Sequence, residues 1–202
     1  KNNKGDWTIW RHKLMVPTLK QVRLKEFGYL PVGATVISGT VSYVASRFYV
    51  SVVVDIDEKS KHNKDLETAY RTATDGIGID LGIQDLAVVS DGRKFENINK
   101  NSKVKRLEKR LRREQRRLSR KYESKKKKGG KTATASANIE KQKLKVQKLH
   151  HRIDEIRKDY ENKVIHEIVK QKPRFITVED LNVKGMMKNR HLAKAVAAQR
   201  FN

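Results

Sequence analysis

Apolar and polar residues alternate along the N-terminal part of the chain, with the period of two that is typical of strands with one buried face. The pattern is clearest from Phe48 to Val54, where every second residue is apolar. Ala45, Ser46 and Arg47 form a predicted hairpin loop between two strands. The predicted strands cover residues 14–17, 21–24, 35–43 and 48–55. We therefore interpret residues 1–56 as part of a small β-barrel or sandwich.

A second β-unit begins after a polar stretch, residues 57–75, which we interpret as a linker. Residues 76–82 and 86–90 are predicted strands. The Asp91-Gly92 dipeptide that follows them is a strong signal for a tight turn into a return strand. Much later, Pro173 ends a helical pattern, and residues 174–181 predict a short buried strand that ends in two acids.

A heptad-like spacing replaces the alternation over residues 103–170. Two narrow apolar stripes are separated by small residues from Gly129 to Asn138, and they predict two long helices packed as an antiparallel hairpin. A further helix is predicted over 192–200. Strands and long helices thus alternate over residues 76–202, a pattern of the α/β class.

The overall charge narrows the choice of partners. The chain has 202 residues, with 47 Lys and Arg against 23 Asp and Glu, and a formal net charge of +24. Such an excess repels itself and favours a polyanion as partner, of which nucleic acid is the common one. A membrane is disfavoured, because no apolar run approaches the ~20 residues of a spanning helix. The absence of cysteine excludes disulfides and thiolate zinc sites within this chain.

The positive charge is concentrated in the first predicted helix of the hairpin. Between Lys103 and Lys128 there are 15 Lys and Arg and three Asp and Glu. A helix that only needed solubility would carry mixed signs, so this density favours contacts with phosphates. Phosphate contacts position a nucleic acid without reading its sequence. The predicted nucleic-acid-binding residues follow one side of the helix: Arg106, Arg110, Arg113, Arg117, Arg120 and Lys121.

Two carboxylates are candidates for chemistry. Asp80 is predicted inside an apolar strand, where an unpaired charge is costly, and Gly78 and Gly82 on the same strand face leave space beside it. Glu179 is predicted at the exit of a buried strand, a place where open α/β sheets bind ligands. Carboxylates on neighbouring strands can hold Mg²⁺ or Mn²⁺. Two such ions can promote phosphodiester hydrolysis.

Both acids also have a structural interpretation. Asp80 could accept hydrogen bonds at a strand end, and Glu179 could cap the next turn, although Asp180 is the better candidate for that role. Two-metal sites generally use three or more acids, and the sequence offers no convincing third. The other acids considered lie in the predicted turn or on the predicted hairpin: Asp91, Asp154 and Asp159.

Two sequence runs resemble motifs of the TnpB proteins of insertion sequences. The run from Gly78 to Gly92 (G-I-D-L-G-I-Q-D-L-A-V-V-S-D-G) is similar to the opening motif of their RuvC-like domain. The run from Ile176 to Met186 is similar to a later motif of the same domain. The basic stretch 112–121 between them resembles the insert of this family, and residues 14–17 and 48–52 resemble the end of its wedge domain. The resemblance covers nearly the whole chain.

The resemblance implies an RNase H-like (RuvC-like) mixed sheet whose first and fourth strands run side by side. The helical hairpin over 103–170 would be an insert in this domain, and residues 1–56 would be part of a β-barrel wedge domain. The implied activity is that of a transposon-encoded, RNA-guided DNA endonuclease, with a guide RNA and a DNA target as partners. Asp80 and Glu179 would then be catalytic ligands of Mg²⁺ or Mn²⁺. Such a protein would act in the cytoplasm of a prokaryote, at the nucleoid.

The family pattern also includes a third catalytic Asp and a four-cysteine zinc ribbon, neither of which is found in this sequence. We therefore expect the chain to be a fragment that is inactive or nearly so alone, with zinc bound only in a missing C-terminal part. Three alternatives stay open. They are a nuclease-dead RNA-guided DNA-binding protein, a DNA-joining transposase or resolvase of the same fold, and a structural or RNA-binding module.

Overall fold

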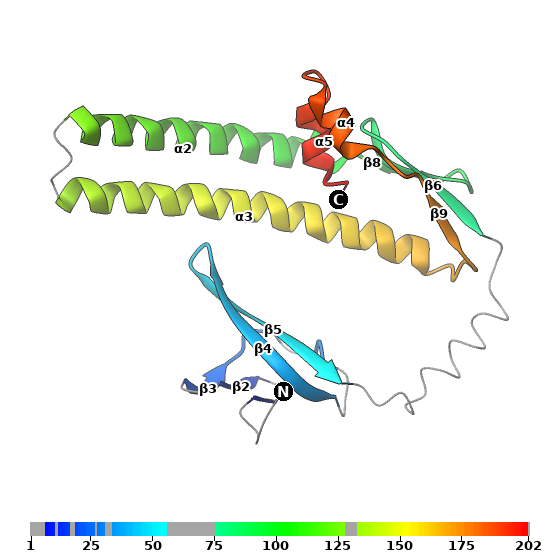
Figure 1. Ribbon diagram of the computed structural model, residues 1–202, viewed down its shortest axis with the longest axis horizontal. Coiled ribbons are helices and arrows are strands. Elements are labelled where there is room, and N and C mark those ends of the chain that lie inside the picture. Colours follow the sequence, from blue (N-terminus) through cyan, green and yellow to red (C-terminus); the bar gives the residue numbers. More distant parts are fainter. Residues whose placement is uncertain are drawn as a thin grey trace. The chain divides into compact units, whose positions relative to one another are not determined.

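A computed structural model defines the fold, and it describes residues 7–10, 12–16, 19–26, 28–30, 34–55, 76–127 and 133–201. The chain divides into two units, Lys1–Thr68 and Ala69–Asn202. The described part of the first unit is built of strands, and that of the second combines strands with helices, so the chain is mixed α/β (Figure 1). The predicted linker over 57–75 lies outside the described residues.

The described part of the first unit contains two antiparallel sheets. β1 (Thr8–Ile9), β2 (Lys13–Val16) and β3 (Lys20–Arg23) form one of them, in that order. β4 (Thr35–Val44) and β5 (Arg47–Asp55) form a two-stranded ribbon. The four predicted strands are confirmed in type and approximate position. β1 was not predicted, because a strand of two residues shows no periodicity.

The turn between β4 and β5 is one residue shorter than predicted. Ala45 and Ser46 both adopt positive φ values, 51° and 68°. A two-residue type I′ turn requires this combination, and its twist matches that of the flanking strands. Arg47 is already part of β5, where it pairs with Val44. The prediction of a three-residue loop over Ala45, Ser46 and Arg47 was therefore wrong.

The second unit is organised around a four-stranded mixed sheet. β6 (Ile77–Leu81), β7 (Asp85–Val89) and β8 (Lys94–Glu96) follow one another as antiparallel neighbours. β9 (Ile176–Val178) returns to the sheet much later in the chain and pairs with β6 in parallel. The strand order is β8-β7-β6-β9, so the first and last strands of the unit lie side by side.

β9 differs from the prediction of a buried strand over 174–181. It spans three residues at the edge of the sheet, and all three are exposed. The exposed fractions of Ile176 and Val178 are 40% and 48%. A short apolar run fits a buried strand and an edge strand equally well in the sequence. The predicted burial was therefore wrong, although the presence of a strand here is confirmed.

α2 (Ser102–Lys127) and α3 (Ala133–Val169) form the predicted antiparallel hairpin (Figure 1). Its seam is an apolar cluster of Val104, Leu111, Val146, Leu149 and Ile153. The C-terminal part of α3 covers one face of the sheet through a second cluster of Ile77, Leu86, Val89, Val164 and Ile168.

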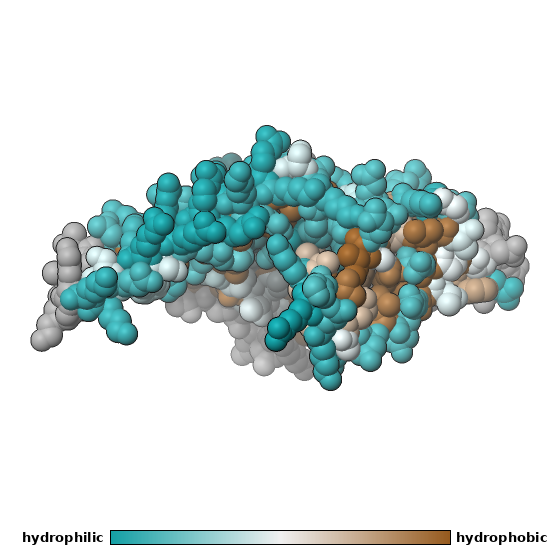
Figure 2. Space-filling view, turned by 90° about the horizontal axis from the view of Figure 1, so that it is seen from above, coloured by the Kyte–Doolittle hydropathy of each residue, from teal (hydrophilic) through white to brown (hydrophobic). Residues whose placement is uncertain are grey.

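The surface seen in Figure 2 is hydrophilic along the hairpin, and its apolar patches gather toward the sheet. In the described ranges, no helix combines the length and apolarity needed to span a membrane.

The described part of the second unit also contains three short helices: η1 (Ile98–Lys100), α4 (Val183–Lys188) and α5 (Ala193–Gln199). α5 confirms the helix predicted over 192–200, whereas α4 was not predicted. The Asn182 side chain accepts a hydrogen bond from the backbone N–H of Gly185 at 2.9 Å at the start of α4. Asn182 therefore has the capping role for which Asp180 was the predicted candidate.

A buried polar contact joins the two helices of the hairpin. Gln142 on α3 is only 4% exposed. Its Nε2 donates to the carboxylate of Glu114 on α2 at 2.7 Å and to the Glu114 backbone carbonyl at 3.1 Å. The hydrogen bond from Gln142 lowers the pKa of Glu114, and the nearby charge of Arg117 acts in the same direction. Glu114 is thus held ionised against the seam.

Replacing Gln142 with methionine is expected to lower the free energy of unfolding by about 1–3 kcal/mol. Glu114 Oε2 would stay at the seam and lose its donor, while Oε1 keeps its pairing with Arg117. An unsatisfied polar atom of this kind costs about that much. Urea unfolding followed by circular dichroism measures the change. Gln147→Met, at an exposed position of the same helix, is the matched control. Equal midpoints for the two variants would contradict the expectation.

Candidate functional site

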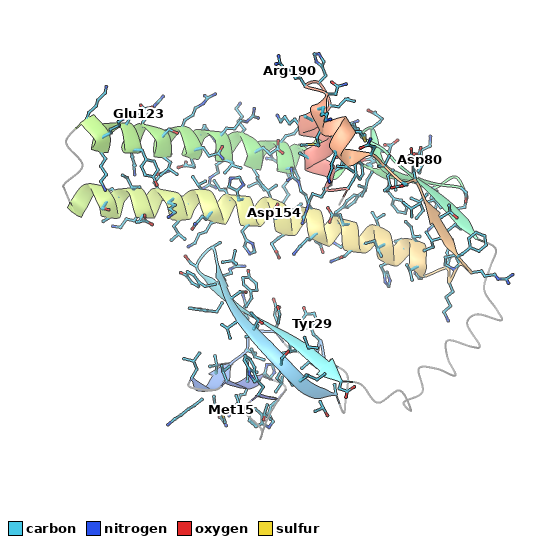
Figure 3. All side chains as sticks on the ribbon, in the orientation of Figure 1. Met15, Tyr29, Asp80, Glu123, Asp154 and Arg190 are labelled. Carbon is cyan, nitrogen blue, oxygen red and sulfur yellow. The ribbon has the colours of Figure 1, made fainter. Side chains whose placement is uncertain are left out.

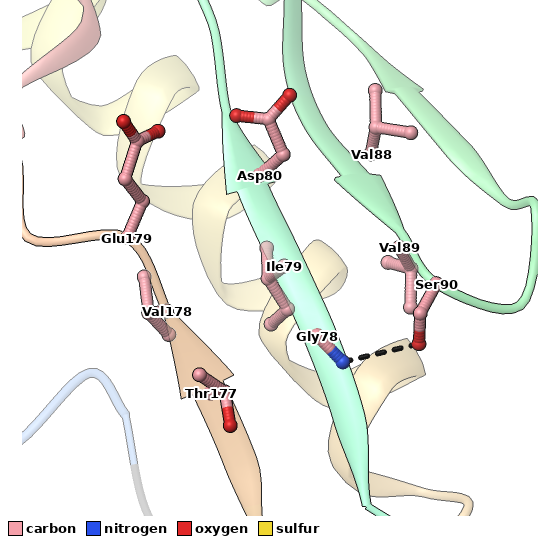
Figure 4. Close-up of a pocket in the computed structure, with 9 residues that line it drawn as sticks. All are labelled: Gly78, Ile79, Asp80, Val88, Val89, Ser90, Thr177, Val178 and Glu179. Carbon is pink, nitrogen blue, oxygen red and sulfur yellow. Dashed lines mark hydrogen bonds between the residues drawn. The ribbon is translucent and has the colours of Figure 1, made fainter.

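Asp80 and Glu179 lie beside each other at the end of the parallel strand pair. Ile79 is opposite Val178 in the register of β6 and β9. Asp80, still in β6, and Glu179, directly after β9, each come one residue later. Both line one open pocket of about 630 Å³, and both side chains point in the same direction (Figure 4). This volume is in the usual range for ligand sites. The structure thus brings together the two acids that the sequence singled out.

The pocket is on the sheet face opposite the one that α3 covers. Ile77 packs in the cluster under α3, with Ile79 against it. Since side chains alternate along a strand, Asp80 points to the other face. Asp80 and Glu179 are both exposed. The expectation that Asp80 is a costly charge within an apolar strand was therefore wrong, because its side of the strand is open to water.

Gly78 and Ser90 form the end of the pocket away from the acids. The backbone N–H of Gly78 donates to Ser90 Oγ at 3.0 Å, and the Ser90 N–H donates to the Gly78 carbonyl at 2.9 Å. A Cβ at Gly78 would meet only the Cβ of Ser90, at 3.8 Å, so this glycine leaves space as predicted. A Cβ at Gly82 would instead come within 3.1 Å of the Asp85 carbonyl, so Gly82 allows a close backbone approach in the β6–β7 loop.

Two pocket residues with a side-chain hydroxyl were not predicted from the sequence. Thr177 and Ser90 both line the pocket (Figure 4). The strand period could have indicated Thr177, which is two residues from Glu179 and therefore on the same face. Ser90 has no comparable signal, because its contact with Gly78 depends on how β6 and β7 pair.

Among the described residues, no group of three or more His, Cys, Asp or Glu is arranged to hold a metal ion. The side chain of Asp91 is bonded to Arg93, whose backbone N–H lowers the pKa of the Asp91 carboxyl. Asp159 pairs with Lys163 at 2.7 Å. Asp154 lies along the hairpin, away from Asp80 (Figure 3). Each of the three acids considered as a third ligand therefore lies elsewhere.

The predicted cationic stripe is exposed along α2. Its five arginines fall within about 80° of arc at 3.6 residues per turn, and all five are exposed: Arg106, Arg110, Arg113, Arg117 and Arg120. α2 carries 14 Lys and Arg and three Asp and Glu. α3 carries eight Lys and Arg and six Asp and Glu. The charge available to a polyanion therefore belongs to α2 rather than to the hairpin as a whole.

Three members of the predicted set also make contacts within the chain, one of which is the hydrogen bond from Arg106 Nε to the Ser102 carbonyl at 3.4 Å. Lys121 is partly buried, and its Nζ donates to the backbone carbonyl of Asn138 on α3 at 3.2 Å. Arg117 pairs with Glu114 at 2.8 Å. Lys121 thus joins the two helices, and its contact with nucleic acid stays a prediction.

The fold and site define a class of protein: a mixed α/β domain with two carboxylates on adjacent strands and a polycationic helix in an inserted hairpin. Comparison with known families agrees with this description. Residues 51–190 match the IS605 OrfB family, whose description is "Probable transposase". The match covers more than half of the chain, and the chain belongs to this family, the TnpB type of insertion-sequence protein.

Two curated relatives extend the comparison. "Putative RNA-guided DNA endonuclease InsQ" of Escherichia coli (strain K12) is 34% identical over 150 residues, which are 74% of this chain and 32% of that protein. "Putative RNA-guided DNA endonuclease" of Streptomyces pristinaespiralis is 33% identical over 169 residues, 83% of this chain and 36% of that protein. The chain thus spans about a third of the length of these relatives.

Proposed function

We propose that the chain is the part of an RNA-guided, metal-dependent DNA endonuclease that supplies two of its metal ligands, Asp80 and Glu179. The observation that carries the proposal is their position directly after the paired residues Ile79 and Val178 of the parallel strands β6 and β9, in one open pocket. Membership of a transposase family and the names of the two relatives support the same activity.

The fold that we propose for the second unit is RNase H-like. Three antiparallel strands followed by a fourth that returns in parallel to the first, in the order β8-β7-β6-β9, support it. Such an arrangement carries acids from distant parts of the chain to one end of the sheet. For the first unit we propose the end of a wedge domain. Its two antiparallel sheets are compatible with part of a small barrel.

The donor atoms at the pocket fit a hard divalent cation. Asp80 and Glu179 offer carboxylate oxygens, both are exposed, and the pocket around them is open. Mg²⁺ and Mn²⁺ are the ions that such ligands prefer. When bound, a pair of these ions activates a water and stabilises the leaving oxygen in phosphodiester hydrolysis. The part of the two side chains is to hold the ions and to fix their position on rigid strands.

We propose that α2 holds a nucleic-acid backbone through its arginine stripe. A guide RNA and a DNA target are the partners that the names of the relatives imply. Base pairing between them would read the sequence, while the protein contacts phosphates. The place of action that follows is the cytoplasm of a prokaryote, at the DNA.

The 202-residue chain by itself is expected to cleave little or no DNA. Within the part of the chain that the structure describes, two carboxylates share the pocket and no third joins them. Two-metal nucleases need enough negative charge to hold both ions. In this proposal the third acid and any zinc site belong to residues beyond this chain.

DNA cleavage by the protein as encoded at its locus, expressed together with RNA transcribed from that locus, tests the proposal. Cleavage of a matching DNA is expected with Mg²⁺ or Mn²⁺, and it should stop in EDTA and with DNA that does not match the guide. Binding of RNA and matching DNA without cleavage in any metal would instead indicate a nuclease-dead relative. Joining of DNA ends would indicate a transposase or resolvase.

A further inference from the structure

The loop that follows the Asp80 strand is held by two buried side-chain amides. β6 ends at Leu81, and the carbonyls of the next two residues, Gly82 and Ile83, accept hydrogen bonds from side chains. Gln199 Nε2 donates to the Gly82 carbonyl at 2.8 Å, and Asn97 Nδ2 donates to the Ile83 carbonyl at 2.7 Å. The exposed fractions of Gln199 and Asn97 are 4% and 7%.

Gln199 is fixed in turn by Asn99. Asn99 Nδ2 donates to Gln199 Oε1 at 3.2 Å and to the Ala198 carbonyl at 3.1 Å. The amide of Gln199 therefore has one orientation in which its oxygen accepts from Asn99 and its nitrogen faces Gly82. Val196, only 1% exposed, anchors the same helix in the interior.

The contacts continue into the helical hairpin. Asn99 Oδ1 accepts a hydrogen bond from Arg157 Nε on α3 at 2.7 Å. Arg157 Nη2 also pairs with Glu108 on α2 at 3.1 Å. Side chains from α2, α3, η1 and α5 thus form one connected set that ends on the carbonyl of Gly82, two residues after Asp80.

We infer that Gln199 and Asn99 are positioning residues for Asp80. Residues 80–82 are consecutive, so a displacement of the Gly82 carbonyl moves the end of β6 and the Asp80 carboxylate with it. Glu179 follows a different strand, β9, and does not share this support. A site for divalent ions depends on the separation of its ligands, so loosening one carboxylate weakens ion binding. This inference rests on the proposed function, in which Asp80 is a metal ligand.

Gln199→Met is the variant that tests the inference, because it keeps the approximate length of the side chain and removes both amide contacts. Binding of Mn²⁺ alone is measured by electron paramagnetic resonance, and cleavage is measured over a range of Mn²⁺ concentrations. We expect the half-saturating Mn²⁺ concentration to rise about 10-fold in both measurements, the lower end of the effect of losing an outer-shell contact. RNA binding is expected to stay within about twofold.

Gln142→Met is the matched control, since Gln142 is the same residue type with the same 4% exposure and lies at the hairpin seam. It is expected to lower stability without changing the half-saturating Mn²⁺ concentration. An equal shift in the two variants would overturn the inference, because it would show a general loss of structure. No shift in Gln199→Met would overturn it as well.

Two further measurements keep the test decisive. If Gln199→Met does not fold, Asn99→Asp keeps the acceptor for Arg157 and removes the donor to Gln199, and a Mn²⁺ shift in the same direction is expected. Hydrogen exchange of the backbone amides from Asp80 to Leu86 measures how firmly the end of β6 is held, and it does not require nuclease activity. Absence of both Mn²⁺ binding and DNA cleavage would reject the proposed function. Faster exchange from Asp80 to Leu86 in Gln199→Met, with exchange in β9 unchanged, would even then show that Gln199 holds the end of β6. Unchanged exchange would overturn the inference.

Discussion

Replacement of Asp80 by alanine is expected to reduce the rate of RNA-guided DNA cleavage by at least about 10³-fold. The change removes one of two carboxylates that share the pocket, and losing about 4 kcal/mol of transition-state stabilisation corresponds to that factor. Glu179→Ala should have an effect of the same order, because each acid supplies ligands that the other cannot replace. Single-turnover cleavage at saturating Mg²⁺ measures both rates.

Asp80→Asn and Glu179→Gln separate the effect of side-chain charge on cleavage from the effect of side-chain size. Both variants keep the shape of the residue and remove its negative charge. Both are expected to be as inactive as the alanine variants, while RNA and DNA binding stays unchanged. Asp180→Asn is the control, because Asp180 is also exposed and adjoins Glu179 in the chain but does not line the pocket. It should retain full activity. Full activity in Asp80→Asn would assign Asp80 a structural role at the end of β6.

The sequence was sufficient for the elements with a long periodic signal. The helical hairpin extends over tens of residues, so its two apolar stripes repeat often enough to identify both helices, and most of the cluster observed at the seam belongs to them. At the end of the second stripe, Val164 and Ile168 pack against the sheet instead of the first helix. The strands β4 and β5 were found for the same reason. β9 was found as a strand but not as an exposed edge, because a run of three residues, two of them apolar, carries no information about what covers it.

The site was predictable at the level of residue types and less so at the level of geometry. Asp80 and Glu179 were singled out because each breaks an apolar run and each falls in a motif of a known family. Their common pocket depends on the parallel pairing of β6 with β9, which joins segments about 100 residues apart. The support of Gly82 by Gln199 spans a similar separation. Neither Gly82 nor Gln199 belongs to a periodic sequence pattern that would indicate this contact.

Substitution of Arg110, Arg113 and Arg120 by glutamine is expected to weaken RNA binding by about 100-fold at physiological salt. All three are exposed on the same side of α2. Each phosphate contact contributes roughly 0.7–0.9 to the slope of log K against log salt concentration, so the slope should fall by about 2–3 units. Filter binding between about 50 and 200 mM salt measures it, a range over which such slopes are well resolved.

A second triple variant separates the arginine stripe from the net charge of the helix. Lys109, Arg112 and Arg116 lie on the other exposed flank of α2, so their replacement by glutamine removes the same charge within the same helix. If phosphates contact the stripe, this control should lose far less affinity and keep most of the salt slope, because charges off the contact release few counterions. Equal losses in the two variants would show that RNA contacts the whole exposed circumference of α2, and the six predicted positions would then have no special role. Loss of helicity in circular dichroism is not expected in either variant, since glutamine has a helix propensity close to that of arginine and lysine.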